Sequence, residues 1–107
     1  MSRETAKLYI DTRDNKKILV KIIVNGIGYK KSSINPSVKS EVVLSLIDDI
    51  LKDARIKKED IGKIFIEKGP GSFTGLKVGI AIANALSFSL QKPVNKIILG
   101  KIETPLY

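Results

Sequence analysis

Hydrophobic and polar residues alternate along the first third of the chain in a way typical of β-strands. Leu8 to Ile10 is a short apolar run that ends at Asp11-Thr12, and Lys17 to Val24 is rich in β-branched residues. Asn25-Gly26 follows directly, with Ile27 to Lys31 beyond it. Because Asn-Gly between two such runs favours a type I′ turn, we predict an antiparallel meander of three strands.

Apolar residues spaced three and four apart indicate two helices in the rest of the chain. Glu41 to Ala54 carries an apolar stripe with polar residues on the remaining surface, and Leu76 to Leu90 is apolar nearly all round. Strands are predicted at Ile61 to Glu67 and at Val94 to Leu99. The order β-β-β-α-β-α-β predicts an α/β fold with a mixed five-stranded sheet and helices packed on it.

A glycine-rich turn, Gly69-Pro70-Gly71-Ser72-Phe73-Thr74-Gly75, joins the fourth predicted strand to the second helix. Such a turn points backbone N–H groups and a helix N-terminus at an anion, usually phosphate. The candidate phosphate-binding residues are Asp11, Thr12, Gly69, Gly71, Ser72, Thr74 and Gly75. Composition alone slightly favours a plain strand-to-helix turn over an anion site, because the spacing matches neither a P-loop nor the dinucleotide fingerprint.

The composition of the 107 residues removes several kinds of chemistry. The chain has no cysteine and no histidine, which excludes disulfides, Cys/His zinc sites, thiol catalysis and histidine bases. We therefore expect no metal site and no catalytic residue. The longest apolar candidate, Val78 to Leu90, is broken by polar residues and is too short to span a membrane, so we expect a cytoplasmic protein. The net charge of +8, mostly from lysine, fits either an RNA-binding surface or an ordinary lysine-rich one.

The run Gly-Pro-Gly-Ser-Phe-Thr-Gly-Leu-Lys-Val-Gly from Gly69 to Gly79 resembles the signature of the TsaB (YeaZ) family. The likeness continues through Ala81 to Leu86 and Pro93-Val94, and it fits Ser40-Glu41 at the start of a helix. The resemblance implies a ribonuclease H-like, actin-like (ASKHA) fold, with residues 1–107 forming one N-terminal lobe and the family's second lobe absent. It also implies a non-catalytic subunit in threonylcarbamoyl modification of tRNA adenosine 37.

The partners that the resemblance implies are a TsaD-like catalytic subunit and a TsaE-like ATPase. It also implies that the chain contacts tRNA through the complex and forms a homodimer when it is alone. In the family the two helices of this lobe build the dimer interface. Candidate contacts on the two predicted helices are Leu44, Ile47, Leu51, Val78, Ile82 and Leu86. The extra apolar width of the helices is also compatible with ordinary core packing.

Two departures from the family pattern limit what the resemblance implies about ligands. Arg13 stands where the family's first turn usually continues as Asp-Thr-Ser, which adds bulk and charge near any phosphate. We therefore expect no cofactor, with ATP or ADP bound only in the presence of a partner. The catalytic paralogue holds its metal with histidines just beyond the position of Pro93-Val94, and Asn95 to Thr104 contains none.

Two alternative functions stay open on the sequence. One is a nucleotide-binding, ATPase-like or protease-like enzyme, for which Asp11, Glu67 and Glu103 are the carboxylates available to magnesium, although no paired base accompanies them. The other is a small basic RNA-binding module that acts through its positive charge.

Overall fold

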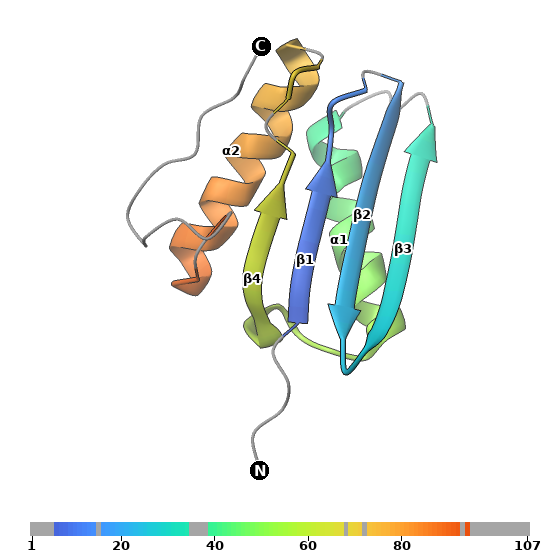
Figure 1. Cartoon of the computed structure of the whole chain (residues 1–107), viewed down its shortest axis with the longest axis vertical. Coiled ribbons are helices and arrows are strands. Elements are labelled where there is room, and N and C mark those ends of the chain that lie inside the picture. The colour runs from blue at the N-terminus through green and yellow to red at the C-terminus, as the bar shows by residue number, and fades with distance from the viewer. Residues whose placement is uncertain are drawn as a thin grey trace.

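A computed structural model of the chain describes residues 6–14, 16–34, 39–67, 69–71, 73–92 and 94. Its elements follow in the order β1 (Ala6–Asp11), β2 (Lys17–Val24), β3 (Ile27–Ile34), α1 (Lys39–Ala54), the short 3₁₀ helix η1 (Lys58–Asp60), β4 (Ile61–Ile66) and α2 (Phe73–Leu90). In Figure 1, α1 lies behind the sheet, and α2 runs beside it along β4. The predicted α/β fold is confirmed, and η1 is an element that the sequence pattern did not reveal.

The predicted antiparallel meander is confirmed. Strand β1 pairs antiparallel with β2, and β2 pairs antiparallel with β3. Asn25 and Gly26 join β2 to β3 with φ values of 52° and 74°. Positive φ at both central residues is what a type I′ turn requires, and this turn has the twist that the two flanking strands need.

Within the described residues the sheet has four strands, in the order β3-β2-β1-β4, where the sequence pattern predicted five. Strand β4 returns parallel to β1 after the crossover through α1. Val94 forms a parallel bridge to Ile64 of β4, so the strand predicted at Val94 to Leu99 contributes one bridge to this sheet. Residues 95–99 of that prediction lie outside the described residues.

The hydrophobic core lies between the sheet and the two helices. It is built from alternate residues of the strands and from one side of each helix, and its members include Leu8, Ile10, Ile18, Val20, Ile22, Val43, Ile47, Ile50, Ile64, Leu76, Ile80 and Ala83. Each large aliphatic side chain removed from water in this way contributes about 1.5–3 kcal/mol to stability.

Helix α2 packs on the sheet with only one of its sides, although it is apolar nearly all round. Leu76, Ile80 and Ala83 are buried, whereas Val78 and Ile82 are half-buried. The remaining apolar surface of α2 is therefore free of the sheet. Among the described residues, no helix is both long enough and apolar enough to cross a membrane.

Both helices end at a residue with left-handed backbone. Arg55 has φ 57° after α1, and Gln91 has φ 57° after α2. In the turn after α1, the Ile56 N–H donates to the carbonyl of Leu51 at 3.1 Å. This six-residue closure satisfies a carbonyl that the last helical turn leaves open.

Candidate functional site

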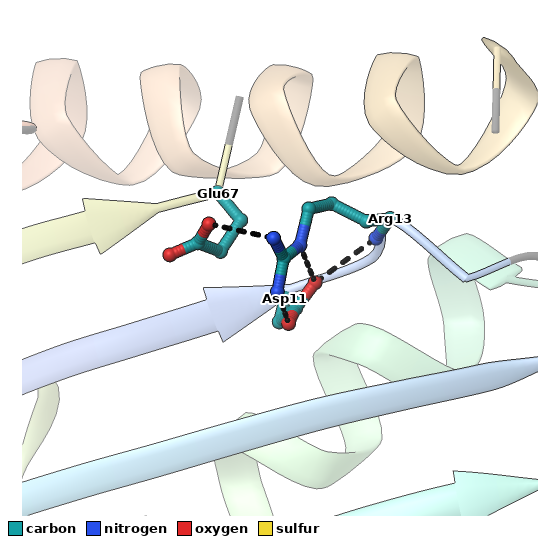
Figure 2. A network of polar contacts seen from close by, with 3 residues as sticks. All are labelled: Asp11, Arg13 and Glu67. Carbon is teal, nitrogen blue, oxygen red and sulfur yellow. Dashed lines mark hydrogen bonds and ion pairs between the residues drawn. The ribbon is translucent and has the colours of Figure 1, made fainter. Parts of the chain in front are cut away.

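Arg13 connects two carboxylates at the carboxyl ends of β1 and β4 (Figure 2). Its Nε donates to Oδ1 of Asp11 at 3.1 Å and its Nη2 to Oδ2 at 3.0 Å, so the guanidinium binds the carboxylate with both branches. The Arg13 backbone N–H donates to the same Oδ1 at 3.1 Å. Arg13 Nη1 also lies 3.3 Å from Oε2 of Glu67, the residue that follows β4. One cation therefore joins residues from two neighbouring strands.

The same contacts set the charges of this group. Burial by itself raises the pKa of the Asp11 carboxyl, but the hydrogen bonds and charge of Arg13, with the charge of Lys17, outweigh burial and hold this pKa below its ordinary value. The hydrogen bond to Asp11, with the negative charges of Asp11 and Glu67, raises the pKa of Arg13. Asp11 and Arg13 are thus both ionised at neutral pH.

A cavity of about 390 Å³ opens beside the Asp11–Arg13 pair. It is lined by Asp11, Arg13, Asp14, Lys17, Leu19, Pro70 and Gly71. The cavity has both signs of charge on its wall, and the guanidinium closest to it is already bound to carboxylates. It is therefore not a simple anion cradle.

Only some of the residues predicted to bind phosphate lie together at the cavity. Asp11 and Gly71 line the cavity, but Thr12 is 1% exposed and faces α2 instead. A Cβ at Gly79 would overlap the Thr12 hydroxyl, and a Cβ at Gly71 would lie 2.8 Å from Cβ of Arg13. The two glycines thus permit close packing of α2 and of the turn against the residues that follow β1.

The remaining predicted phosphate-site residues belong to the turn and the start of α2. Gly69 has a left-handed φ of 113° and a cis bond to Pro70. Thr74 is exposed and Gly75 is buried in the first turn of α2, while Ser72 lies outside the described residues. Within the described ranges, no group of three or more Asp, Glu, His or Cys side chains is placed to hold a metal ion.

The predicted interface residues divide into exposed and buried positions. Leu44 is 50% exposed on α1, but Ile47 and Leu51 are 2% and 5% exposed and pack in the core, so they offer a partner no side-chain surface. Their burial follows from the apolar stripe of α1, whose centre faces the sheet. On α2, half-buried Val78, Ile82 and Leu86 line one side of the helix and pack against the core at its margin.

Sequence reasoning missed two features of these surfaces. The sequence suggested Glu67 as a magnesium ligand and did not indicate that it pairs with Arg13. Parallel pairing of β1 with β4 brings the ends of both strands together, and it was the feature that could have predicted this contact. Phe88, 77% exposed near the end of α2, was not among the predicted contacts. A large aromatic residue in a helix that is apolar all round was the signal for it.

The fold and site define an α/β lobe of the actin-like class, with a glycine turn at the carboxyl ends of two parallel strands. The family model described as "TsaD: tRNA N6-adenosine threonylcarbamoyltransferase" matches residues 35–98, and the chain belongs to this family. The TsaB protein of Bacillus subtilis is 33% identical over 76 residues, which cover 71% of this chain and 31% of the relative. The TsaB protein of Buchnera aphidicola is 38% identical over 62% of this chain and 34% of the relative.

Comparisons with a transferase and with a solved structure agree with this assignment. The tRNA N6-adenosine threonylcarbamoyltransferase of Syntrophus aciditrophicus is 34% identical over 85% of this chain and 28% of the relative. YeaZ from Pseudomonas aeruginosa superposes with a TM-score of 0.80 at 26% identity, over 88% of this chain and 44% of that chain. The two TsaB relatives carry the name of a tRNA threonylcarbamoyladenosine biosynthesis protein. The chain spans about a third of the length of the curated relatives and less than half of the solved one.

Proposed function

We propose that this chain is a non-catalytic subunit in threonylcarbamoyl modification of tRNA adenosine 37, and that it associates with a protein partner through α1 and α2. The observation that carries this proposal is the apolar margin of α2, between its buried and its exposed positions. Val78, Ile82 and Leu86 recur every four residues there and stay half-buried, although other residues of α2 already fill the space above the sheet. Together with the buried positions, these three residues make the apolar stripe of α2 wider than its contact with the sheet requires.

Two large apolar side chains are also exposed on the two helices. Leu44 on α1 is 50% exposed, and Phe88 on α2 is 77% exposed. Covering such side chains contributes roughly 25 cal/mol for each Å² of apolar surface removed from water. The proposed partners are a TsaD-like catalytic subunit working with a TsaE-like ATPase, and a second copy of this chain when it is alone. Relatives that carry the names TsaB and threonylcarbamoyltransferase support this setting.

The chemistry of the cavity supports a subunit without its own nucleotide reaction. A magnesium-bound nucleotide requires free carboxylate oxygens, and the carboxylates of Asp11 and Glu67 are both paired with Arg13. Gly71, which was expected to approach phosphate, packs against Arg13. Asp14, the third carboxylate on the cavity wall, accepts a hydrogen bond from the Lys16 N–H. The residues present therefore form a poor site for a magnesium nucleotide, and the chain has no histidine or cysteine to serve as base or nucleophile. Any nucleotide in the working assembly is assigned to the partner.

The test is association of the full chain with the TsaD-like subunit of its own organism, measured by co-purification and by light scattering across concentrations. We expect a mass that rises with concentration, co-elution with the TsaD-like subunit, and tRNA modification by the mixture. The Leu44→Glu/Phe88→Glu variant should weaken association about tenfold or more, because it places charge in an apolar contact.

The matched control is Ser45→Glu/Ser89→Glu, which adds the same two charges at exposed neighbouring positions. The control should associate like the wild type, and circular dichroism should show that both variants are folded. A strictly monomeric wild-type chain that ignores the TsaD-like subunit would overturn the proposal.

A further inference from the structure

Lysines gather on the face of the sheet that no described helix covers, which we call the open face. Side chains alternate between the two faces of a strand, so the residues between the buried ones lie away from α1 and α2. The open face carries five exposed lysines, Lys7, Lys17, Lys21, Lys30 and Lys63, and the aromatic pair Tyr9 and Phe65. It is the face turned toward the viewer in Figure 1. All four strands contribute to it.

The lysines of the open face stand beside one another across the strands. Lys7 is directly opposite Lys63, and Lys21 is directly opposite Lys30. Like charges in opposite positions destabilise a sheet, so these two pairs cost stability when no anion lies between them. None of the five lysines makes an ion pair with a described residue, and the carboxylates at the end of this face are bound to Arg13. Within the described residues, Lys17 acts on the Asp11 carboxylate through its charge, and Lys7, Lys21, Lys30 and Lys63 have no carboxylate partner.

Two aromatic rings lie among these lysines on the open face. The rings of Tyr9 and Phe65 are stacked with centroids 4.8 Å apart and planes at 12°, and Nζ of Lys21 lies 5.7 Å from the Tyr9 centroid. Both aromatic side chains are half-buried, and no described helix lies above them. A cavity of about 140 Å³ lies beside them, and its wall also includes Leu19, Lys21 and the carboxylates of Asp11 and Glu67. The open face therefore combines cations with an accessible aromatic surface.

The opposite side of the molecule carries the opposite charge. Helix α1 exposes Glu41, Asp48, Asp49 and Asp53, with Lys52 among them. A polyanion is repelled by this helix surface and attracted to the open face, because exposed charges of one sign steer ligands of the other. The net charge of +8 is thus distributed unevenly over the described surface.

We propose that the open face binds single-stranded RNA, with phosphates on the five lysines and a base against Tyr9 and Phe65. An extended strand of RNA presents a phosphate at every nucleotide and an aromatic base between phosphates, which is the pattern that the open face complements. An acidic protein segment would match the lysines but would leave the aromatic pair without a role. This inference goes beyond the proposed association through α1 and α2, because it concerns the other side of the molecule and needs no protein partner.

The test is fluorescence anisotropy with the full chain and a short labelled single-stranded RNA, titrated at several salt concentrations. We expect binding that weakens as salt rises. Lys7→Gln/Lys63→Gln and Lys21→Gln/Lys30→Gln should each reduce affinity about tenfold and lower the slope of log affinity against log salt by about 1.4, because each lost phosphate contact to a single strand removes about 0.7. Tyr9→Leu, which keeps an apolar side chain, should reduce affinity about tenfold through lost stacking.

The control is Lys52→Gln/Lys58→Gln, which removes the same charge from outside the open face and should change affinity less than about twofold. Equal losses in this control would overturn the proposal, as would wild-type binding that does not depend on salt. Polyglutamate binding as tightly as RNA would assign the face to an acidic protein segment instead. The lysine variants change only exposed side chains, so they keep the test valid if Tyr9→Leu does not fold.

Discussion

At the scale of single residues, Arg13 determines the character of the cavity at the end of the sheet. Its guanidinium holds Asp11 through two hydrogen bonds and reaches Glu67 from the same position. A planar guanidinium with five donors suits this double role better than an ammonium group would. Two carboxylates that would otherwise be free for a cation are thereby committed within the chain.

We predict that Asp11→Asn removes part of the dependence of stability on acid pH. Because the folded-state pKa of Asp11 is lowered, its contribution to stability is fully present above the unfolded pKa of about 3.9 and is lost as pH falls through the folded value. At pH 7 we expect Asp11→Asn to cost about 0.5–1 kcal/mol, a small value because Arg13 is 45% exposed and solvent screens the pair.

Urea unfolding from pH 7 to pH 2 measures this effect. The difference in unfolding free energy between wild type and Asp11→Asn should shrink below about pH 4. Asp48→Asn, on the exposed side of α1, serves as the control and should follow the wild-type profile. A constant difference between wild type and Asp11→Asn at every pH would contradict the assignment.

A second prediction concerns Gly79 of α2, which packs closely against Thr12, the residue that follows β1. In Gly79→Ala the new methyl group would overlap the buried hydroxyl of Thr12, and overpacking of this kind costs about 1–3 kcal/mol. The gain in helix propensity from Gly to Ala is at most about 1 kcal/mol, so we expect a net loss in thermal unfolding. Gly28→Ala is the control, because open space surrounds that position.

The double variant Thr12→Ala/Gly79→Ala should recover much of this loss. Removing the hydroxyl makes room for the methyl group, and within the described residues this buried hydroxyl has no hydrogen-bond partner to lose. If Thr12→Ala and Gly79→Ala are simply additive, the close approach of the two residues is not the cause.

At the scale of elements, the ends of the two helices place non-glycine residues in an unfavourable backbone conformation. Arg55 and Gln91 both have φ 57°, a region that glycine enters at little cost. The hydrogen bonds that close each helix are made by the residues that follow, Ile56 and Lys92. The sequence therefore carries strain at two positions where most helices use glycine.

We predict that Arg55→Gly raises the unfolding free energy by about 0.5–1 kcal/mol, because it relieves the left-handed conformation at an exposed residue. Equilibrium unfolding in urea measures the change. Lys57→Gly lies in the same connector with φ −106°, so it should give no gain. Equal effects from the two substitutions would show that the connector, and not the conformation of Arg55, sets the result.

At the scale of the whole molecule, one core holds the sheet and both helices together. The buried residues of β1, β2, β4, α1 and α2 belong to a single cluster, and half-buried Tyr29 of β3 packs against it. Exposed apolar residues such as Leu44 and Phe88 lie outside it. Stability and association thus depend on different sets of apolar side chains.

We predict that Ile50→Ala, at a position with 0% exposure, lowers the unfolding free energy by about 2–5 kcal/mol. Leu44→Ala, at 50% exposure on the same helix, should change it by less than about 0.5 kcal/mol. Far-UV circular dichroism and tyrosine fluorescence during urea unfolding should report one common transition for each variant. Separate transitions for the two probes would contradict a single core.

Local features of the sequence determined most of the elements of this protein. Alternation over Lys17–Val24 and the pair Asn25-Gly26 predicted the first hairpin correctly, because strand pleat and turn conformation depend on neighbouring residues. Both helices and the parallel return of β4 also followed from local periodicity and connection rules. The glycine-rich turn and the residues after it indicated the family that the comparisons then showed.

Tertiary structure alone decided how these elements meet. Arg13 lies between Asp11 and Glu67 only because β1 and β4 are neighbours, and no local pattern joins residues so distant along the chain. The apolar stripe of α1 was wide enough to place either Leu44 or Ile47 outward, and packing on the sheet chose Leu44. Lysines that look dispersed in the sequence converge on one face, because strand pairing aligns alternate residues of separate segments.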